Sequence, residues 1–137
     1  MISEWKTPLQ NIGSKQNNQN LQRSHAVSYF TRAENLANQF DVITTQGLAF
    51  LFDQSVQEWS FSSSDSTVAS DVNYYASEYF KIHKERMPDV ERLAIILDYV
   101  RTTDGKNRRT AIKDGSGTVH GKSYDIDNFN LSYSQTF

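Results

Sequence analysis

Residues 47–57 read GLAFLFDQSVQ, and most of their side chains are apolar. On an α-helix these apolar residues cover much of the circumference: Leu48, Ala49, Leu51, Phe52 and Val56. A helix that is apolar on several sides usually lies at the centre of a domain. We therefore predict a buried core helix over residues 46–59. Thr44 or Thr45 is its expected N-cap, because a hydroxyl group there accepts a hydrogen bond from a free backbone N–H.

A second helical pattern precedes the core helix. Between residues 24 and 40, apolar residues recur at spacings of three and four, which is typical of one stripe of an α-helix. The stripe consists of Ala26, Phe30, Ala33, Ala37 and Phe40. Residues 11–20 carry few apolar side chains, and we expect them to form a loop or a frayed approach to this helix.

Two more helices are predicted after the core helix. The first is capped by Ser66 or Thr67 and extends to about Glu85, with an inward stripe of Val68, Val72, Tyr75, Ala76, Tyr79 and Ile82 or His83. The second has Pro88 in its first turn, where the missing N–H costs nothing. Its apolar face continues to Val100, and we expect it to end between residues 102 and 105.

The last part of the chain has a different pattern. Residues 109–113 and 118–120 flank the turn sequence Asp114-Gly115-Ser116-Gly117, in which glycine permits a positive φ. This predicts a short β-hairpin, followed by a tail that packs through Leu131. The chain is thus predicted to be one mainly α domain over residues 1–137, with an approach segment (1–23), a helical core (24–104), and a C-terminal hairpin and tail (105–137).

Composition narrows the function classes. A chain of 137 residues fits one domain, and its net charge of −2 argues against a broad basic face that would bind nucleic acid. No apolar run approaches the roughly 18 residues of a membrane span, and the first ten residues lack the pattern of a cleavable signal. The absence of cysteine excludes disulfides, thiolate zinc sites and a cysteine nucleophile. The three histidines share no metal-ligand spacing, so we expect neither a metal nor a cofactor.

Ser, Asn and Gln together supply 35 residues, so much of the predicted surface is polar but uncharged. A solvated exterior explains this. Contact with a neutral polymer such as a carbohydrate is the alternative, because hydroxyl and amide groups recognise sugars by hydrogen bonds.

Two polar residues on the core helix are candidate functional residues. Asp53 and Gln57 are four positions apart and so project from one face of the helix, whereas Gln54 is expected to point into solvent. A polar group on a buried helix destabilises the fold unless it is hydrogen-bonded. Two interpretations stay open: a buried carboxylate that holds a loop or an arginine, and a polar floor beneath a cleft.

A second candidate set follows the fourth predicted helix and comprises Arg108, Arg109, Thr118, His120 and Asp125. We predict a buried or half-buried contact between Arg109 and Asp53, which would join the two sets, and we predict that His120 lies near the same cleft. Ordinary cross-strand contacts within a hairpin are the alternative.

These stretches resemble a lysozyme-like, chitosanase-related family of peptidoglycan-active proteins. The family's central helix, G-L-A-L-x-F-D-x-x-V-Q, resembles residues 47–57. The preceding helix, Y-F-x-x-A-x-x-L-A-x-x-F, is matched by residues 29–40. The C-terminal signature, R-R-x-x-I-x-x-G-x-G-T-V-H-G-x-x-Y-D, is matched by residues 108–125. The three matches occur in the same order as in the family.

The resemblance implies the C-terminal lobe of a lysozyme-like glycoside hydrolase that acts on peptidoglycan or a related β-1,4 amino-sugar polymer. Glycoside hydrolysis needs a carboxylic acid that protonates the leaving oxygen. The family's acid is expected as a Glu that ends an upstream helix, followed by a Ser-Phe-Gly element, and this chain has neither. The catalytic residue is therefore unknown, and an N-terminal segment or a partner chain is expected to supply it.

The candidate residues named above take the role of substrate-cleft or supporting residues under this resemblance. The alternative is a non-enzymatic glycan-binding or structural module of a phage-like particle or an envelope assembly. A small interaction protein is a third possibility that rests on size alone. If the resemblance holds, the site of action is the bacterial envelope or a phage-like particle.

Overall fold

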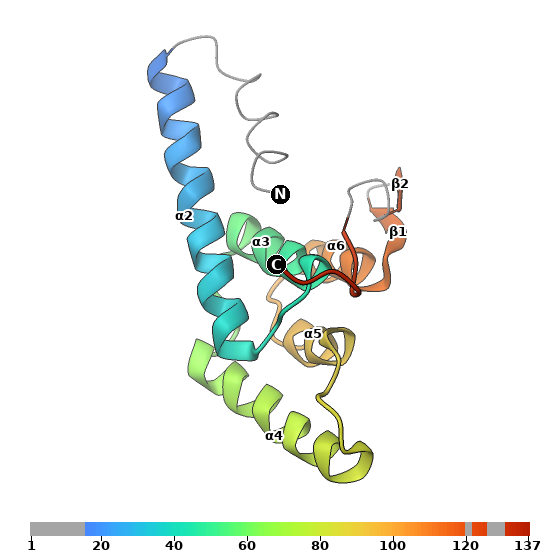
Figure 1. Cartoon of the computed structure of the whole chain (residues 1–137). Helices are drawn as coiled ribbons and strands as arrows, with labels where there is room; N and C mark the ends of the chain where they lie inside the picture. The colour runs from blue at the N-terminus through green and yellow to red at the C-terminus, as the bar shows by residue number, and fades with distance from the viewer. Residues whose placement is uncertain (1–15, 120–121, 126–130) are drawn as a thin grey trace.

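The computed structural model describes residues 16–119, 122–125 and 131–137, and this part of the chain is mainly helical (Figure 1). This confirms the mainly α fold class. Its elements in chain order are α2 (Gln16–Phe40), α3 (Thr45–Gln57), α4 (Asp65–His83), α5 (Asp89–Leu97), α6 (Thr103–Asp114), β1 (Ser116–Val119) and β2 (Lys122–Asp125). None of the helices within the described ranges is both long enough and apolar enough to cross a bilayer.

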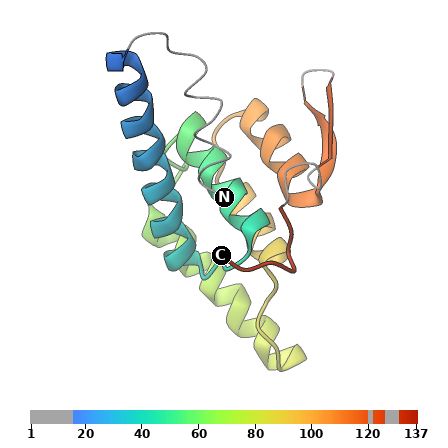
Figure 2. The ribbon, with the colours of Figure 1, turned by 45° about the horizontal axis from the view of Figure 1, so that its top comes forward.

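Helix α3 is the centre of the fold. Figure 2 shows it between α2 on one side and α6 on the other, and it contacts both. Its residues are buried from Thr45 to Ser55, as predicted for the core helix. The hydroxyl of Thr44 accepts a hydrogen bond from the backbone N–H of Gly47 at 3.2 Å, so the predicted N-cap is confirmed. Val56 lies beyond the buried part and is 38% exposed.

Helix α2 packs its predicted stripe against α3 but begins earlier than expected. Ala33, Leu36, Ala37 and Phe40 are each 1% exposed or less. The helix starts at Gln16, inside the segment expected to be an approach. Residues 16–23 are mostly Gln and Asn and contain neither Gly nor Pro, so they can extend a helix without an apolar stripe. Periodicity therefore gave no signal for this extension.

Helix α4 confirms the inward stripe in part, because Ala76 and Tyr79 are half-buried and pack against the core. Val68 and Val72 are fully buried, but Tyr75 is 51% exposed and Ile82 is 74% exposed, so their predicted burial is wrong. In Figure 1 the C-terminal end of α4 extends away from the other helices, and Ile82 and His83 in its last turn are both exposed. The cap is Ser64, whose hydroxyl accepts from the N–H of Thr67 at 3.2 Å.

Helix α5 ends at Leu97, short of the predicted boundary at residues 102–105. The hydroxyl of Thr102 accepts a hydrogen bond from the N–H of Gly105 at 2.9 Å and thereby caps a new helix, α6. Val100, expected on the helix, lies in the connecting loop and is still buried, at 3% exposed.

The predicted hairpin exists, but its position was wrong. Residues 109–113, expected to form the first arm, belong to α6. Gly115 has a φ of 87° and ends α6 instead of forming the hairpin turn. The strands follow it as an antiparallel pair in which Ser116 lies opposite Asp125 and Val119 opposite Lys122.

The C-terminal tail lies over the first turn of α3. The backbone N–H of Thr45 donates to the carbonyl of Gln135 at 2.8 Å, and that of Gln46 donates to the carbonyl of Ser132 at 3.2 Å. The phenol of Tyr133 donates to the carbonyl of Lys113 at 2.7 Å, which ties the tail to the end of α6. Leu131 is buried, as predicted.

The end of α4 provides a test of backbone strain. Exposed Lys84 has a φ of 59°, in the left-handed region that favours glycine. Relief of this strain exceeds the entropy that glycine loses, so we expect Lys84→Gly to raise the free energy of unfolding by roughly 0.5–1 kcal/mol. Lys81→Gly, the same change within the exposed helix, should lower it by about 1 kcal/mol. Urea denaturation measures both, and a loss of stability in Lys84→Gly would contradict the argument.

The half-buried phenol of Tyr133 predicts a loss of stability at alkaline pH. Burial, assisted by the charges of Asp89 and Asp114, raises the pKa of Tyr133. Above about pH 10 the unfolded chain releases this proton while the folded chain retains it, so the stabilising contribution is lost as pH rises. We expect Tyr133→Phe to reduce the slope of unfolding free energy against pH above 10. Tyr74→Phe, which alters an exposed ring, is the control, and equal slopes in both variants would refute this assignment.

Candidate functional site

An ion-pair network joins α3 to α6, and we call it the Asp53 network (Asp53, Glu58, Arg108 and Arg109). The side chain of Arg109 is fully buried. Its Nε lies 3.3 Å from Oδ2 of Asp53, and its Nη1 donates to Oε2 of Glu58. The predicted contact between Asp53 and Arg109 is therefore confirmed.

Arg108 binds the same carboxylate from the outside. Its Nη2 lies 2.6 Å from Oδ1 of Asp53, and its Nε donates to Oδ2 at 3.4 Å. The side chain of Arg108 is 38% exposed, whereas that of Asp53 is 10% exposed. Asp53 thus lies between one buried guanidinium and one that reaches the surface.

Glu58 completes the network, and sequence reasoning missed it. Its carboxylate accepts hydrogen bonds from the backbone N–H of Arg101 at 2.9 Å and from the hydroxyl of Thr102 at 3.2 Å. Glu58 follows the last residue of α3 and has a non-helical φ of −133°. Helical spacing therefore could not place Glu58 beside Asp53. The sequence signal for Glu58 was that an acidic residue directly follows residues 47–57.

Gly105 makes room for the network. A Cβ at this position would overlap Oε2 of Glu58 and Nη1 of Arg109, and it would lie 2.7 Å from the hydroxyl of Thr102. The first turn of α6 can therefore approach the buried ion pair only because residue 105 has no side chain. Both carboxylates of the network accept hydrogen bonds from guanidinium groups, and this arrangement suits positioning of charge better than proton donation to a substrate.

Gln54 and Gln57 of α3 have roles opposite to those expected. Gln57 is exposed and does not join the network. Gln54, expected in solvent, is fully buried, and its Nε2 donates to the carbonyl of Ser60 at 3.1 Å. The reason is that α3 is buried on all sides as far as Ser55 and leaves the core only in its last residues.

The remaining candidates lie at the hairpin. Thr118 is in β1 opposite Ser123, and Asp125 is in β2 opposite Ser116. His120 lies outside the described residues, so its predicted proximity to the cleft stays a prediction. The structure thus brings Asp53, Arg108 and Arg109 together, and it places β1 beside α6, which carries both arginines.

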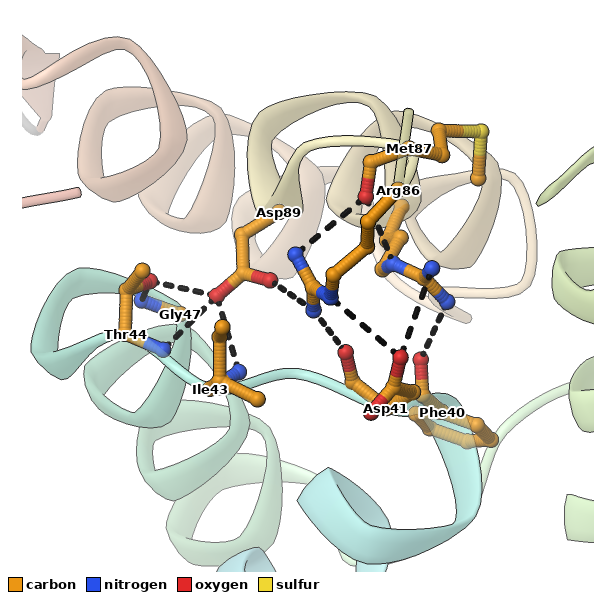
Figure 3. Close-up of polar contacts among 9 residues, drawn as sticks. Phe40, Asp41, Ile43, Thr44, Gly47, Arg86, Met87 and Asp89 are labelled. Carbon is orange, nitrogen blue, oxygen red and sulfur yellow. Dashed lines mark hydrogen bonds and ion pairs between the residues drawn. The ribbon is translucent and has the colours of Figure 1, made fainter. Parts of the chain in front are cut away.

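A second network was not predicted, and we call it the Asp89 network (Asp41, Thr44, Arg86, Asp89 and Arg92; Figure 3). The side chain of Asp89 is fully buried. Its Oδ2 accepts from the backbone N–H of Ile43 at 3.1 Å, and from both the N–H (2.8 Å) and the hydroxyl of Thr44. Its Oδ1 lies 2.8 Å from Nη2 of Arg86.

Two arginines complete this network. Arg86 also contacts the carboxylate of Asp41, with Nε 3.3 Å from Oδ2. Arg92 is buried, and it donates to the carbonyls of Met87 at 2.9 Å and Phe40 at 3.1 Å. Burial first, and then the charge of Arg86, lowers the pKa of Arg92. The sequence does contain a signal for Asp89. It is an acidic residue directly after Pro88, and carboxylates favour the first turn of a helix.

Within the described ranges, no three His, Asp or Glu side chains are grouped so that they could hold a metal ion. Comparisons with protein-family models, with curated proteins and with solved structures found no match to this chain.

The Asp53 network predicts that substitution of its two adjacent arginines lowers the free energy of unfolding by different amounts. Arg109→Met leaves two buried carboxylates without their shared partner, so we expect it to lower the free energy of unfolding by about 3–5 kcal/mol. Arg108→Met removes a half-exposed ion pair and should cost at most about 1 kcal/mol. Urea denaturation of both variants measures the difference, and equal losses would show that the burial of Arg109 does not determine its contribution.

Proposed function

We propose that this chain acts as the C-terminal lobe of a lysozyme-like glycoside hydrolase on peptidoglycan or a related β-1,4 amino-sugar polymer. The observation that carries the proposal is the pair of ion contacts from Asp53 to Arg108 and Arg109. These contacts join two of the three stretches on which the family resemblance rests, the central helix and the C-terminal signature.

The packing of α2 supports the same proposal. The third matching stretch, residues 29–40, contributes four residues to the hydrophobic core: Ala33, Leu36, Ala37 and Phe40. The same core includes Leu48, Leu51 and Phe52 of the central helix. Residues that match the family's motifs therefore contact one another across three helices, as expected if the motifs maintain one lobe.

The network also suggests which roles these residues have. Asp53 and Glu58 are held by arginine, and neither is placed to protonate a leaving oxygen. We assign them to positioning of α6 and of the segment that follows it. Arg108 is the member that reaches the surface, where a guanidinium can donate to hydroxyl, acetamido or carboxylate oxygens of a glycan. The catalytic acid then comes from a further segment or from a partner chain.

The test is co-sedimentation of the chain with insoluble peptidoglycan, together with a reducing-end assay on peptidoglycan and on chitosan. We expect retention on peptidoglycan without release of reducing ends. Arg108→Ala should weaken retention by about tenfold, the value of one charge-assisted hydrogen bond. Lys106→Ala removes an exposed cation from the same helix and serves as the matched control.

Each result bears on a separate part of the proposal. Failure of the unmodified chain to sediment would refute glycan binding, and turnover by the chain alone would refute the need for a supplied acid. Equal effects of the two substitutions would remove Arg108 from the binding surface.

The alternative, a non-enzymatic glycan-binding or structural module, is favoured by the engagement of both network carboxylates with arginine. It predicts the same retention. The gene separates the two functions, because a coding sequence for an upstream helix that ends in Glu favours the hydrolase.

A further inference from the structure

An open groove of about 570 Å³ lies beside the Asp89 network. One wall is the side of α4, and the other is formed by the turn after α2, the loop between α4 and α5, and Arg92 of α5. The residues used in the argument are Asn73, Ser77, Phe80 and Lys81 on α4, and Arg86 and Arg92 opposite them. The volume falls within the range of small-molecule sites, and one or two sugar rings would fit.

Three basic side chains and one acidic side chain line the groove. Lys81, Arg86 and Arg92 line it, and Asp41 is the acidic residue among the lining side chains. Lys81 pairs with Glu78, but both side chains are exposed, and such a pair contributes at most about 1 kcal/mol. Lys81 can therefore turn toward a ligand at little cost.

Arg86 is held in place before any ligand arrives. Its Nη2 is bound to the buried carboxylate of Asp89 at 2.8 Å, and its Nε faces the exposed carboxylate of Asp41 at 3.3 Å (Figure 3). Its side chain is 33% exposed, and that of Asp41 is 59% exposed. An entering anion can therefore compete with Asp41 for a guanidinium whose orientation Asp89 already fixes.

Repulsion between Arg86 and Arg92 also favours an anionic ligand. Burial first, and then the charge of Arg86, lowers the pKa of Arg92, whereas the charges of Asp41 and Asp89 raise it. A second carboxylate in the groove would reduce the repulsion. The wall formed by α4 contributes the amide of Asn73, the hydroxyl of Ser77 and the ring of Phe80, which is 55% exposed. An aromatic face beside hydrogen-bonding groups suits the apolar face and the hydroxyl groups of a sugar.

We propose that this groove binds a carboxylate-bearing amino sugar of the glycan, with Lys81 and Arg86 at the carboxylate and Phe80 against the sugar ring. The inference rests on the proposed function and deepens it, because it selects acidic glycans such as peptidoglycan over neutral chitin and cationic chitosan.

The experiment is a titration of the ¹⁵N-labelled full chain followed by NMR amide shifts. The probes are N-acetylmuramic acid, which has a carboxylate, N-acetylglucosamine, which has none, and acetate. We expect N-acetylmuramic acid to shift amides of residues that line the groove and to bind at least about fivefold more tightly than either other probe, since one charge-assisted contact contributes about 1 kcal/mol or more. Equal binding of N-acetylglucosamine would refute the carboxylate site, and equal binding of acetate would refute the sugar site.

Exposed side chains allow substitutions that preserve the fold. Lys81→Glu should weaken binding of N-acetylmuramic acid at least fivefold, while Lys106→Glu makes the same charge change on α6 and should have no effect. Phe80→Ala should weaken binding, whereas Tyr74→Ala, an exposed ring on α4 that does not line the groove, should not. Equal responses within either pair would overturn the proposed contacts.

Failure of this inference is distinguishable from failure of the proposed function. If the chain sediments with peptidoglycan but N-acetylmuramic acid leaves the groove amides unshifted, the groove assignment is wrong while the glycan lobe stands. If N-acetylmuramic acid binds the groove but peptidoglycan is not retained, the groove site stands and the glycan-lobe function fails.

Discussion

Complete burial of α3 from Thr45 to Ser55 is the constraint on which the rest of the structure depends. A polar side chain on a buried helix must find a hydrogen-bond partner. Ser55 finds it within α3, at the carbonyl of Leu51, and four other polar side chains of α3 bind other segments of the chain. Thr45 donates to the carbonyl of Ser132 in the tail, Gln46 to that of Ile112 at the end of α6, and Gln54 to that of Ser60 in the following loop. Asp53 binds both arginines of α6. The polar residues of the central helix therefore determine where its neighbours dock.

Charged networks hold α5 and the loop that follows it against this helix. At the N-terminal end of α3, Asp89 of α5 accepts hydrogen bonds from residues 43 and 44 and ties the α2–α3 turn to its own helix. At the C-terminal end, Glu58 binds residues 101 and 102 in the loop between α5 and α6. In both networks a buried carboxylate is neutralised by a guanidinium, which offsets the cost of removing the charge from water.

Local chemistry made part of this architecture predictable. The apolar circumference of residues 47–56 predicted the core helix, and the requirement that Asp53 find a partner predicted Arg109. Gly115 was misassigned because glycine suits both a hairpin turn and a helix end, and the polar sequence of residues 103–114 has no apolar stripe to distinguish them. Glu58 was missed because residues 101 and 102, which it binds, lie more than 40 positions away, beyond the reach of helical spacing. The contacts of Asp89 to residues 43 and 44 were missed for the same reason. The inward stripe of α4 was wrong at Tyr75 and in the last turn, where the periodicity continues but the side chains are exposed.

The hydrogen bonds between the tail and α3 have a consequence for biosynthesis. The first N–H groups of the central helix are satisfied by carbonyls of residues 135 and 132, and Ser132 is 87 positions downstream of Thr45. The core helix can form earlier on the ribosome, but its first turn lacks these partners until translation has passed residue 135. Intermediates that lack the tail would therefore expose that turn, and consolidation of the core is expected to follow synthesis of residues 132–135.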